Sequence, residues 1–172
     1  DVDAPNLHLA IEHHNPEITD YNGMKKATID ADKCMECYLC IENCRFDAIH
    51  RSDVYKVDEY QCEGCGVCEA VCPAGAVSMN ELKAGDLMLY KSKDAVFSTA
   101  ELKMGSGNSG MMVTEVKKQM RYNTDAEFTI IDGSPGIGCP VIASMSGVDL
   151  VLIVAEPSVS GLNDMRRIID TS

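Results

Sequence analysis

The order of apolar and polar residues in the first hundred positions predicts several short strands. Alternating stretches at 27–30 and 55–58 are typical of half-buried strands. Two further stretches, 87–90 and 95–99, are separated by only a short polar turn. We expect these two stretches to pair as a β-hairpin.

The second half of the chain predicts alternating helices and buried strands. Apolar residues recur at helical spacing over 109–121, and a last helix begins near Ser160. Two mostly apolar runs, 128–132 and 148–154, are typical of buried strands, and each is followed by a loop. This order predicts an α/β fold with a parallel sheet and functional loops at the carboxyl ends of its strands.

An internal cysteine repeat is the strongest feature of the sequence. Eight of the nine cysteines form two sets of four, offset by 28 positions: Cys34, Cys37, Cys40 and Cys44, then Cys62, Cys65, Cys68 and Cys72. The flanks repeat too, since Ile29-Asp30 and Val57-Asp58 precede the two sets at the same offset. Two similar half-motifs related by an approximate two-fold axis explain this pattern.

The spacing within each set, C-x2-C-x2-C-x3-C, is typical of a site for two [4Fe–4S] clusters. Three cysteines two residues apart can bind one cluster from a tight loop, while the fourth reaches the other cluster. This predicts two ligand sets, Cys34, Cys37, Cys40 and Cys72 for one cluster and Cys44, Cys62, Cys65 and Cys68 for the other. Gly64 and Gly66 suit such a loop because it needs backbone freedom.

Two other uses of these cysteines fit the pattern less well. A disulfide framework needs an oxidising compartment, which nothing in the sequence indicates. Zinc ribbons use pairs of C-x2-C separated by a longer spacer rather than triplets.

Composition narrows the function classes further. The chain has 172 residues and a formal charge of −12, which argues against nucleic-acid binding because phosphates would be repelled. The longest apolar run, 150–155, is too short for a membrane span, and no secretory signal is recognisable. We therefore expect a cytoplasmic protein.

Residues 24–80 resemble a bacterial-type two-cluster ferredoxin domain, with Arg45 where that family usually has proline. The resemblance implies an α+β domain that carries single electrons at low potential. It also implies a protein partner, either a redox partner or a cluster acceptor. An acidic surface suits docking to a basic partner.

Residues 1–23 and 81–172 resemble part of a MinD-type P-loop ATPase core with a ferredoxin domain inserted after switch I. The stretch 1–7 is similar to switch I, and 131–138 is similar to the Walker B and switch II segment. The resemblance implies catalytic roles for Asp3 and Asp132, and nucleotide or Mg²⁺ contacts from Asp1, Gly133, Pro135 and Gly136. It also implies a homodimer formed through the ATPase core. An ordinary Asp-Gly turn after a buried strand would give the same pattern at Asp132.

The glycine- and lysine-containing phosphate loop of that family is not found, so we interpret the chain as a piece of a longer protein. ATP and Mg²⁺ are expected to bind only when that loop is present, and this piece alone is expected to be inactive as an ATPase.

Two alternatives to ATP-coupled electron transfer stay open. The protein could pass clusters or metal to a target, or it could be a plain electron carrier with a structural ATPase remnant. Cys139, the ninth cysteine, is expected to be a small buried residue rather than a metal-handling thiol.

Overall fold

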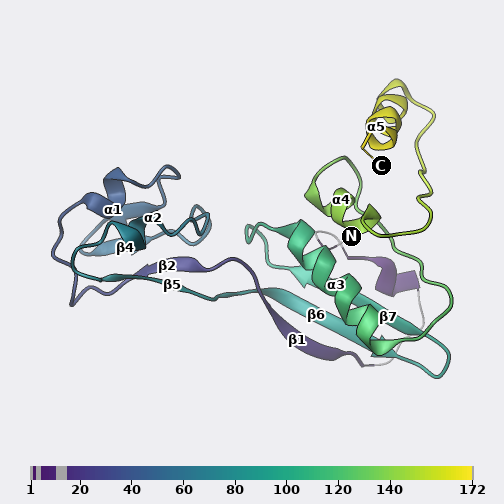
Figure 1. The fold of residues 1–172 in the computed structure, drawn as a ribbon, viewed down its shortest axis with the longest axis horizontal. Helices are drawn as coiled ribbons and strands as arrows, with labels where there is room; N and C mark the ends of the chain where they lie inside the picture. The colour runs from purple at the N-terminus through teal and green to yellow at the C-terminus, as the bar shows by residue number, and fades with distance from the viewer. Residues whose placement is uncertain (1, 3–4, 11–14, 172) are drawn as a thin grey trace. The chain divides into compact units, whose positions relative to one another are not determined.

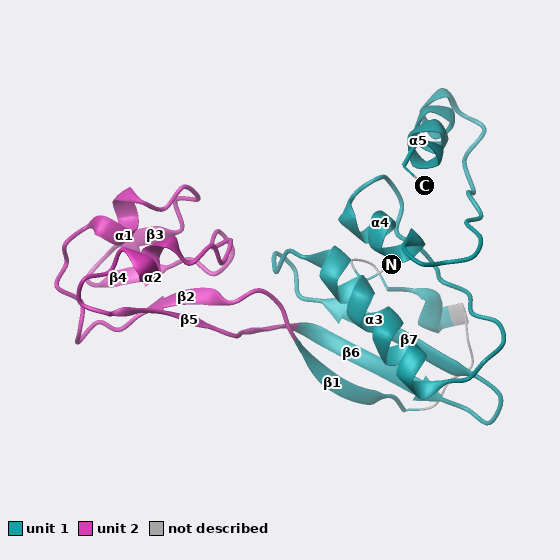
Figure 2. Cartoon of the chain, in the orientation of Figure 1, with its two compact units in different colours: residues 1–21, 85–172 teal, residues 22–84 magenta. Residues whose placement is uncertain are grey.

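The computed structural model describes residues 2, 5–10 and 15–171 of the chain (Figure 1). The chain divides into two compact units (Figure 2). Residues 22–84 form the cysteine unit, and residues 1–21 with 85–172 form the sheet unit. The cysteine unit therefore interrupts the sheet unit in sequence. The chain leaves the sheet unit at the end of β1 (Glu17–Asn22) and returns through β6 (Lys83–Lys91), and these two strands are hydrogen-bonded neighbours.

The cysteine unit consists of two similar halves. The first half contains β2 (Lys26–Ile29), α1 (Leu39–Glu42) and β3 (Ile49–Arg51). The second half contains β4 (Tyr55–Val57), α2 (Val67–Ala70) and β5 (Val77–Asn80). Strand β2 pairs antiparallel with β5, and β3 pairs antiparallel with β4, so each two-stranded sheet takes one strand from each half. A single half is too small to bury its apolar side chains by itself. Pairing strands between the halves lets the two halves bury these side chains against each other.

Backbone hydrogen bonds repeat across the two halves in the same way. Asp30 N–H donates to the Ala76 carbonyl at 2.8 Å, and Asp58 N–H donates to the Ala48 carbonyl at 2.7 Å. Each bond ties the segment just before one cysteine triplet to the segment just after the other set. The cysteine repeat is therefore a structural repeat as well.

Cysteines form part of the core of this unit. The buried cluster combines small and apolar residues with three cysteines: Ala27, Cys40, Ala48, Ile49, Tyr55, Cys62, Cys68 and Val77. A unit of this size buries little apolar surface, and units this small usually need disulfides, metals or another cross-link for stability.

The sheet unit is built on the strand order β1-β6-β7, with β7 spanning Val96–Leu102. The predicted hairpin is confirmed, because β6 and β7 pair antiparallel from Gly85↔Leu102 to Lys91↔Val96. A turn closed by the Ser92 N–H and the Ala95 carbonyl, 2.9 Å apart, connects them. A short 3-10 helix, Leu7–Ala10, belongs to the same unit.

The predicted helix after the hairpin is also confirmed, as α3 (Ser109–Asn123). It packs on β7 and on α4 (Cys139–Met145), and its Met112 side chain is fully buried. Lys117 in α3 donates to the Ala143 and Ser144 carbonyls at 2.9 and 3.0 Å. These bonds give partners to carbonyl groups in the last turn of α4, which have no partner within the helix.

The last helix is α5 (Val159–Ile169), which confirms the helix predicted near Ser160. Ser158 begins it, with its hydroxyl oxygen accepting from the Gly161 N–H at 3.0 Å. This is the N-cap arrangement that serine favours.

The parallel sheet predicted from 128–132 and 148–154 is not formed in the described structure. Both segments are irregular, and neither has a hydrogen-bonded neighbouring strand within the part of the chain described. Their apolar side chains are exposed, Phe128 at 81% and Val154 at 88%. A strand is held by hydrogen bonds to its neighbour, so an apolar run alone does not produce one. No helix among the described residues is long and apolar enough to cross a bilayer.

Candidate functional site

Two cavities in the cysteine unit hold the candidate site. Cavity 1 is lined by four cysteines, Cys34, Cys37, Cys40 and Cys72. Cys34 and Cys37 come from the loop that enters α1, and Cys40 lies in α1 itself. The fourth comes from the residues that follow α2, in the other half. The structure therefore brings a triplet and a distant cysteine around one space.

Cavity 2 repeats this arrangement with the halves exchanged. It is lined by Cys44, Cys62, Cys65 and Cys68. The triplet here leads into α2, and Cys44 follows α1. Each cavity is thus lined by four of the eight cysteines, and the predicted ligation of one cluster by each group of four stays a prediction.

The backbone of both triplet loops has the same unusual conformation. Glu36 and Tyr38 have φ of 53° and 67°, and Gly64 and Gly66, which occupy the same places in the repeat, have φ of 64° and 75°. These left-handed residues curl each loop tightly, so that its three cysteine side chains line one cavity.

The buried thiols resist ionisation. Burial raises the pKa of Cys40 and of Cys68, and the neighbouring cysteines of each triplet raise it further, against backbone N–H groups that lower it. Several thiolates around one space repel one another, so bringing them together as ligands requires a cation.

Cys72 differs from these buried thiols. Its sulfur accepts a hydrogen bond from the Ala76 N–H at 3.3 Å. Burial raises the pKa of Cys72, but the N–H groups of residues 74–77 outweigh it and lower this pKa below its usual value. These N–H groups therefore favour the ionised form of Cys72 more than burial disfavours it.

Four cysteine sulfurs around each cavity are the donor set of a [4Fe–4S] cluster. In the described part of the chain, no three His, Cys, Asp or Glu side chains converge to hold a single metal ion. A cluster bound by four thiolates supplies one-electron chemistry at a potential that hydrogen bonds, charge and solvent exposure set.

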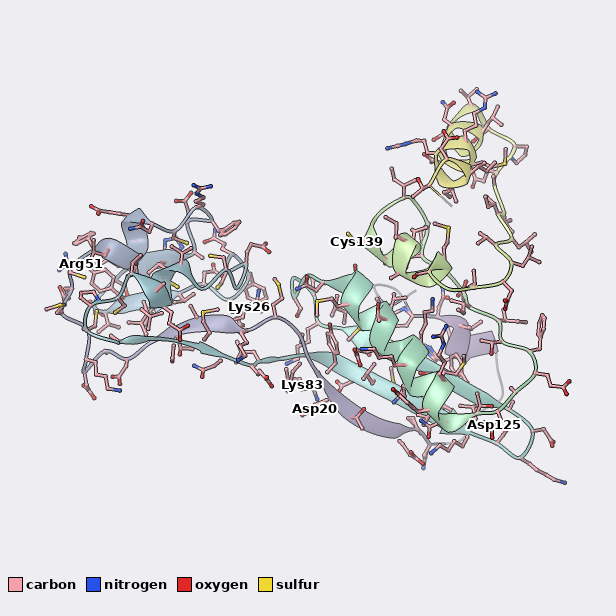
Figure 3. All side chains as sticks on the ribbon, in the orientation of Figure 1. Asp20, Lys26, Arg51, Lys83, Asp125 and Cys139 are labelled. Atoms are coloured by element: carbon pink, nitrogen blue, oxygen red, sulfur yellow. The ribbon has the colours of Figure 1, made fainter. Side chains whose placement is uncertain are left out.

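The two cavities have different charged neighbours. Beside cavity 1, Arg51 donates to the Tyr38 hydroxyl at 2.8 Å and to Glu36 Oε2 at 2.9 Å. Beside cavity 2, Lys26 Nζ donates to the Cys62 carbonyl. Figure 3 labels both cations, which lie at opposite ends of the cysteine unit in that view.

Sequence reasoning missed both of these cations, although the repeat holds a signal for them. At the 28-residue offset, Lys26 corresponds to Val54 and Arg51 corresponds to Met79. A charged residue in one half and an apolar one in the other marks a place where the two sites differ.

The predicted nucleotide residues that the structure describes line neither cavity. Asp1 and Asp3 lie outside the described residues. Four others lie in the irregular segment 124–138 of the sheet unit: Asp132, Gly133, Pro135 and Gly136. A catalytic arrangement of these residues stays a prediction.

The expectation that Cys139 is buried is wrong. Its side chain is exposed at the first residue of α4. The Gly110 backbone lies so close that a Cβ at Gly110 would come within 3.0 Å of the Cys139 Cβ. The α3 and α4 backbones therefore approach each other closely at Gly110 and Cys139, and the Cys139 side chain stays exposed beside this contact.

Comparison with known proteins identifies the cysteine unit. Residues 27–79 match the 4Fe-4S dicluster domain family. The chain is 37% identical over 59 residues to a 7Fe ferredoxin of Hydrogenibacillus schlegelii, covering 34% of this chain and 76% of that protein. The chain belongs to the 4Fe-4S dicluster ferredoxin family. It is also 36% identical over 58 residues to the pyruvate synthase subunit PorD of Methanothermobacter marburgensis, covering 34% of this chain and 69% of that protein.

A longer relative matches beyond the ferredoxin unit. An uncharacterised protein of Methanocaldococcus jannaschii is 34% identical over 172 residues, which is 99% of this chain. The chain spans 60% of the length of that relative. The ferredoxin family assignment makes the cysteine unit an iron–sulfur electron-carrier domain.

Proposed function

We propose that this protein carries single electrons through two [4Fe–4S] clusters, one in each cavity. The observation that carries the proposal is the division of the eight cysteines between the two cavities. Each cavity receives three cysteines from one triplet and a fourth from the other half. In this proposal the ligands of one cluster are Cys34, Cys37, Cys40 and Cys72, and those of the other are Cys44, Cys62, Cys65 and Cys68.

Reconstitution with iron and sulfide tests this proposal. We expect about eight irons and eight sulfides per chain, because each [4Fe–4S] cluster contains four of each. Low-temperature EPR of the reduced protein should show two interacting S = 1/2 centres. Iron that binds without sulfide, or a single magnetically isolated cluster, would contradict the assignment.

The same sample separates an electron carrier from a cluster scaffold. A carrier keeps its clusters through repeated reduction and oxidation. A scaffold loses them rapidly to an apo-protein acceptor. We expect retention, because three of the cluster cysteines are part of the buried core of the cysteine unit and three more pack against it.

An oxidoreductase is the proposed redox partner. One relative is named as a subunit of pyruvate synthase, and another as a subunit of indolepyruvate oxidoreductase. The cysteine unit carries 11 carboxylates against 7 lysines and arginines. This acidic balance favours a partner with a basic docking surface.

We further propose that the sheet unit belongs to a MinD-type ATPase core, dimeric in the whole protein, that couples ATP to electron transfer. The exposed apolar segments 128–132 and 148–154 support this, because a buried parallel sheet has near-continuous apolar strands of this kind. In this proposal they pair with strands outside these 172 residues. Asp3 and Asp132 would then act at the nucleotide, with Asp1, Gly133, Pro135 and Gly136 near its Mg²⁺ and phosphates.

The ATPase proposal predicts a difference between this chain and the longer protein. The 172-residue chain with ATP and Mg²⁺ should give no turnover above background, because it has no phosphate loop to stabilise the transferred charge. The longer protein should hydrolyse ATP and change its cluster potential on nucleotide binding. Phosphate release and a redox titration with and without nucleotide measure the two effects. Mg²⁺-dependent turnover by the short chain would contradict this prediction.

A further inference from the structure

Lys26 is a buried cation beside one of the two cluster sites. The residue is 9% exposed, and its ammonium donates to the carbonyl of Cys62, whose sulfur lines cavity 2. The ion pairs of the described residues do not include Lys26. A buried ammonium with only a carbonyl partner is costly unless an anion lies nearby. A cluster bound by the four cysteines of cavity 2 would supply that negative charge.

The position of the repeat that corresponds to Lys26 holds no cation on the side of cavity 1. The repeat puts Val54 at the position of Lys26. Arg51 contacts two residues that line cavity 1, Glu36 and Tyr38, but its side chain is 50% exposed and pairs with Glu36 at 2.9 Å. Solvent and the paired carboxylate both weaken the field of Arg51.

The carboxylates that line the cavities do not cancel this difference. Each cavity is lined by one exposed glutamate, Glu36 in cavity 1 and Glu63 in cavity 2. An exposed carboxylate is screened by solvent far more than a buried ammonium is. Of these four charged side chains, Lys26 is the buried one, and it contacts the triplet loop of cavity 2.

We infer that Lys26 is a positioning residue that makes the two cluster sites unequal, so that an electron resides preferentially at cavity 2. Its hydrogen bond to Cys62 fixes the triplet loop, and its charge stabilises the extra negative charge that an electron brings. This inference rests on the proposed two-cluster function. It adds the order of the two potentials, which no feature of the cysteine spacing determines.

The test is Lys26→Gln in the chain reconstituted with iron and sulfide. Glutamine keeps an N–H donor for the Cys62 carbonyl but removes the charge. At the wild-type midpoint of the cavity 2 cluster, we expect the ratio of reduced to oxidised cluster to fall about tenfold, equivalent to about 59 mV for one electron. The cavity 1 cluster should change less than about twofold. An EPR-monitored redox titration gives both potentials, and paramagnetically shifted NMR signals of the cysteine β-protons assign each potential to its cysteines.

Two matched variants isolate the buried charge. Lys25→Gln makes the same substitution at the exposed neighbouring residue. In this variant, the ratio of reduced to oxidised form should change less than about twofold for either cluster. Lys26→Arg keeps the charge and should restore the wild-type order. Equal shifts in Lys25→Gln and Lys26→Gln, equal shifts of both clusters, or a shift confined to the cavity 1 signals would overturn the inference.

Iron content separates this inference from the proposed function. A wild-type chain with far fewer than eight irons contradicts the two-cluster function, whereas a full count with unchanged potentials contradicts only the role of Lys26. If Lys26→Gln loses iron, the lost NMR signals should be those of the cavity 2 cysteines, and Lys26→Arg should regain them. Loss of the cavity 1 signals instead would overturn the inference.

Discussion

Replacing Cys72 by alanine is expected to remove the cluster of the first cysteine triplet, although Cys72 follows the second triplet in sequence. Cys72 lines cavity 1 together with Cys34, Cys37 and Cys40, and its sulfur accepts the Ala76 N–H at 3.3 Å. The iron content should fall from about eight to about four per chain, because each cluster contains four irons. The retained cluster should give NMR signals from the second triplet.

Two further variants complete this experiment. Cys44→Ala should have the mirror effect, leaving only the cluster of the first triplet, because Cys44 lines cavity 2. Cys139→Ala is the control, since Cys139 lies in the sheet unit, and it should keep about eight irons. If Cys72→Ala instead loses the signals of Cys62, Cys65 and Cys68, the fourth cysteine of each set binds with its own triplet and the crossed assignment is wrong.

The crossed arrangement could be predicted because the geometry of the cysteine unit is local and repeated. The triplet spacing defines a tight loop, and the repeated flanks predict two equivalent halves. The structure contains both, and its strand pairing β2–β5 and β3–β4 exchanges strands between the halves. The same exchange carries each fourth cysteine to the opposite cavity.

The pairing of the later strands and the burial of Lys26 depend on residues that are distant in sequence, and the sequence alone does not identify those residues. The runs 128–132 and 148–154 have the composition of buried strands, yet a strand needs a hydrogen-bonded neighbour that the described residues do not provide. Lys26 is similar, because a lysine is ordinarily a surface residue. This one is buried, and its ammonium donates to the carbonyl of Cys62, 36 positions away in sequence.

Gly64→Ala is the second variant with a large expected effect, and it tests how tightly the cavity 2 loop is held. A Cβ at Gly64 would lie 2.4 Å from the Lys25 carbonyl oxygen, which is backbone and cannot move away cheaply. The left-handed backbone, with φ of 64°, adds about 1–2 kcal/mol of strain. We expect the loop to shift and the cavity 2 cluster to be lost or to decay rapidly, lowering the iron content toward about four per chain.

Gly66→Ala is the matched control for this prediction. Gly66 has a similar φ of 75°, but a Cβ there meets nothing within 4 Å. The first half of the repeat supports this choice, because Tyr38 carries a full side chain at the equivalent position with φ of 67°. Gly66→Ala should therefore keep about eight irons and cost only about 1–2 kcal/mol, visible as modestly faster loss of cluster absorbance in denaturant.

The comparison of the two alanine variants separates backbone strain from contact. If strain alone governed the loop, Gly64→Ala and Gly66→Ala would lose iron to the same extent. If contact with the Lys25 carbonyl governs it, only Gly64→Ala loses the cluster. Lys25 directly precedes Lys26, the first residue of β2. The contact of Gly64 with the Lys25 carbonyl and the hydrogen bond from Lys26 to Cys62 therefore both hold the cavity 2 loop against the start of β2. A Gly64→Ala protein with both clusters intact would mean that the start of β2 does not constrain the cavity 2 loop.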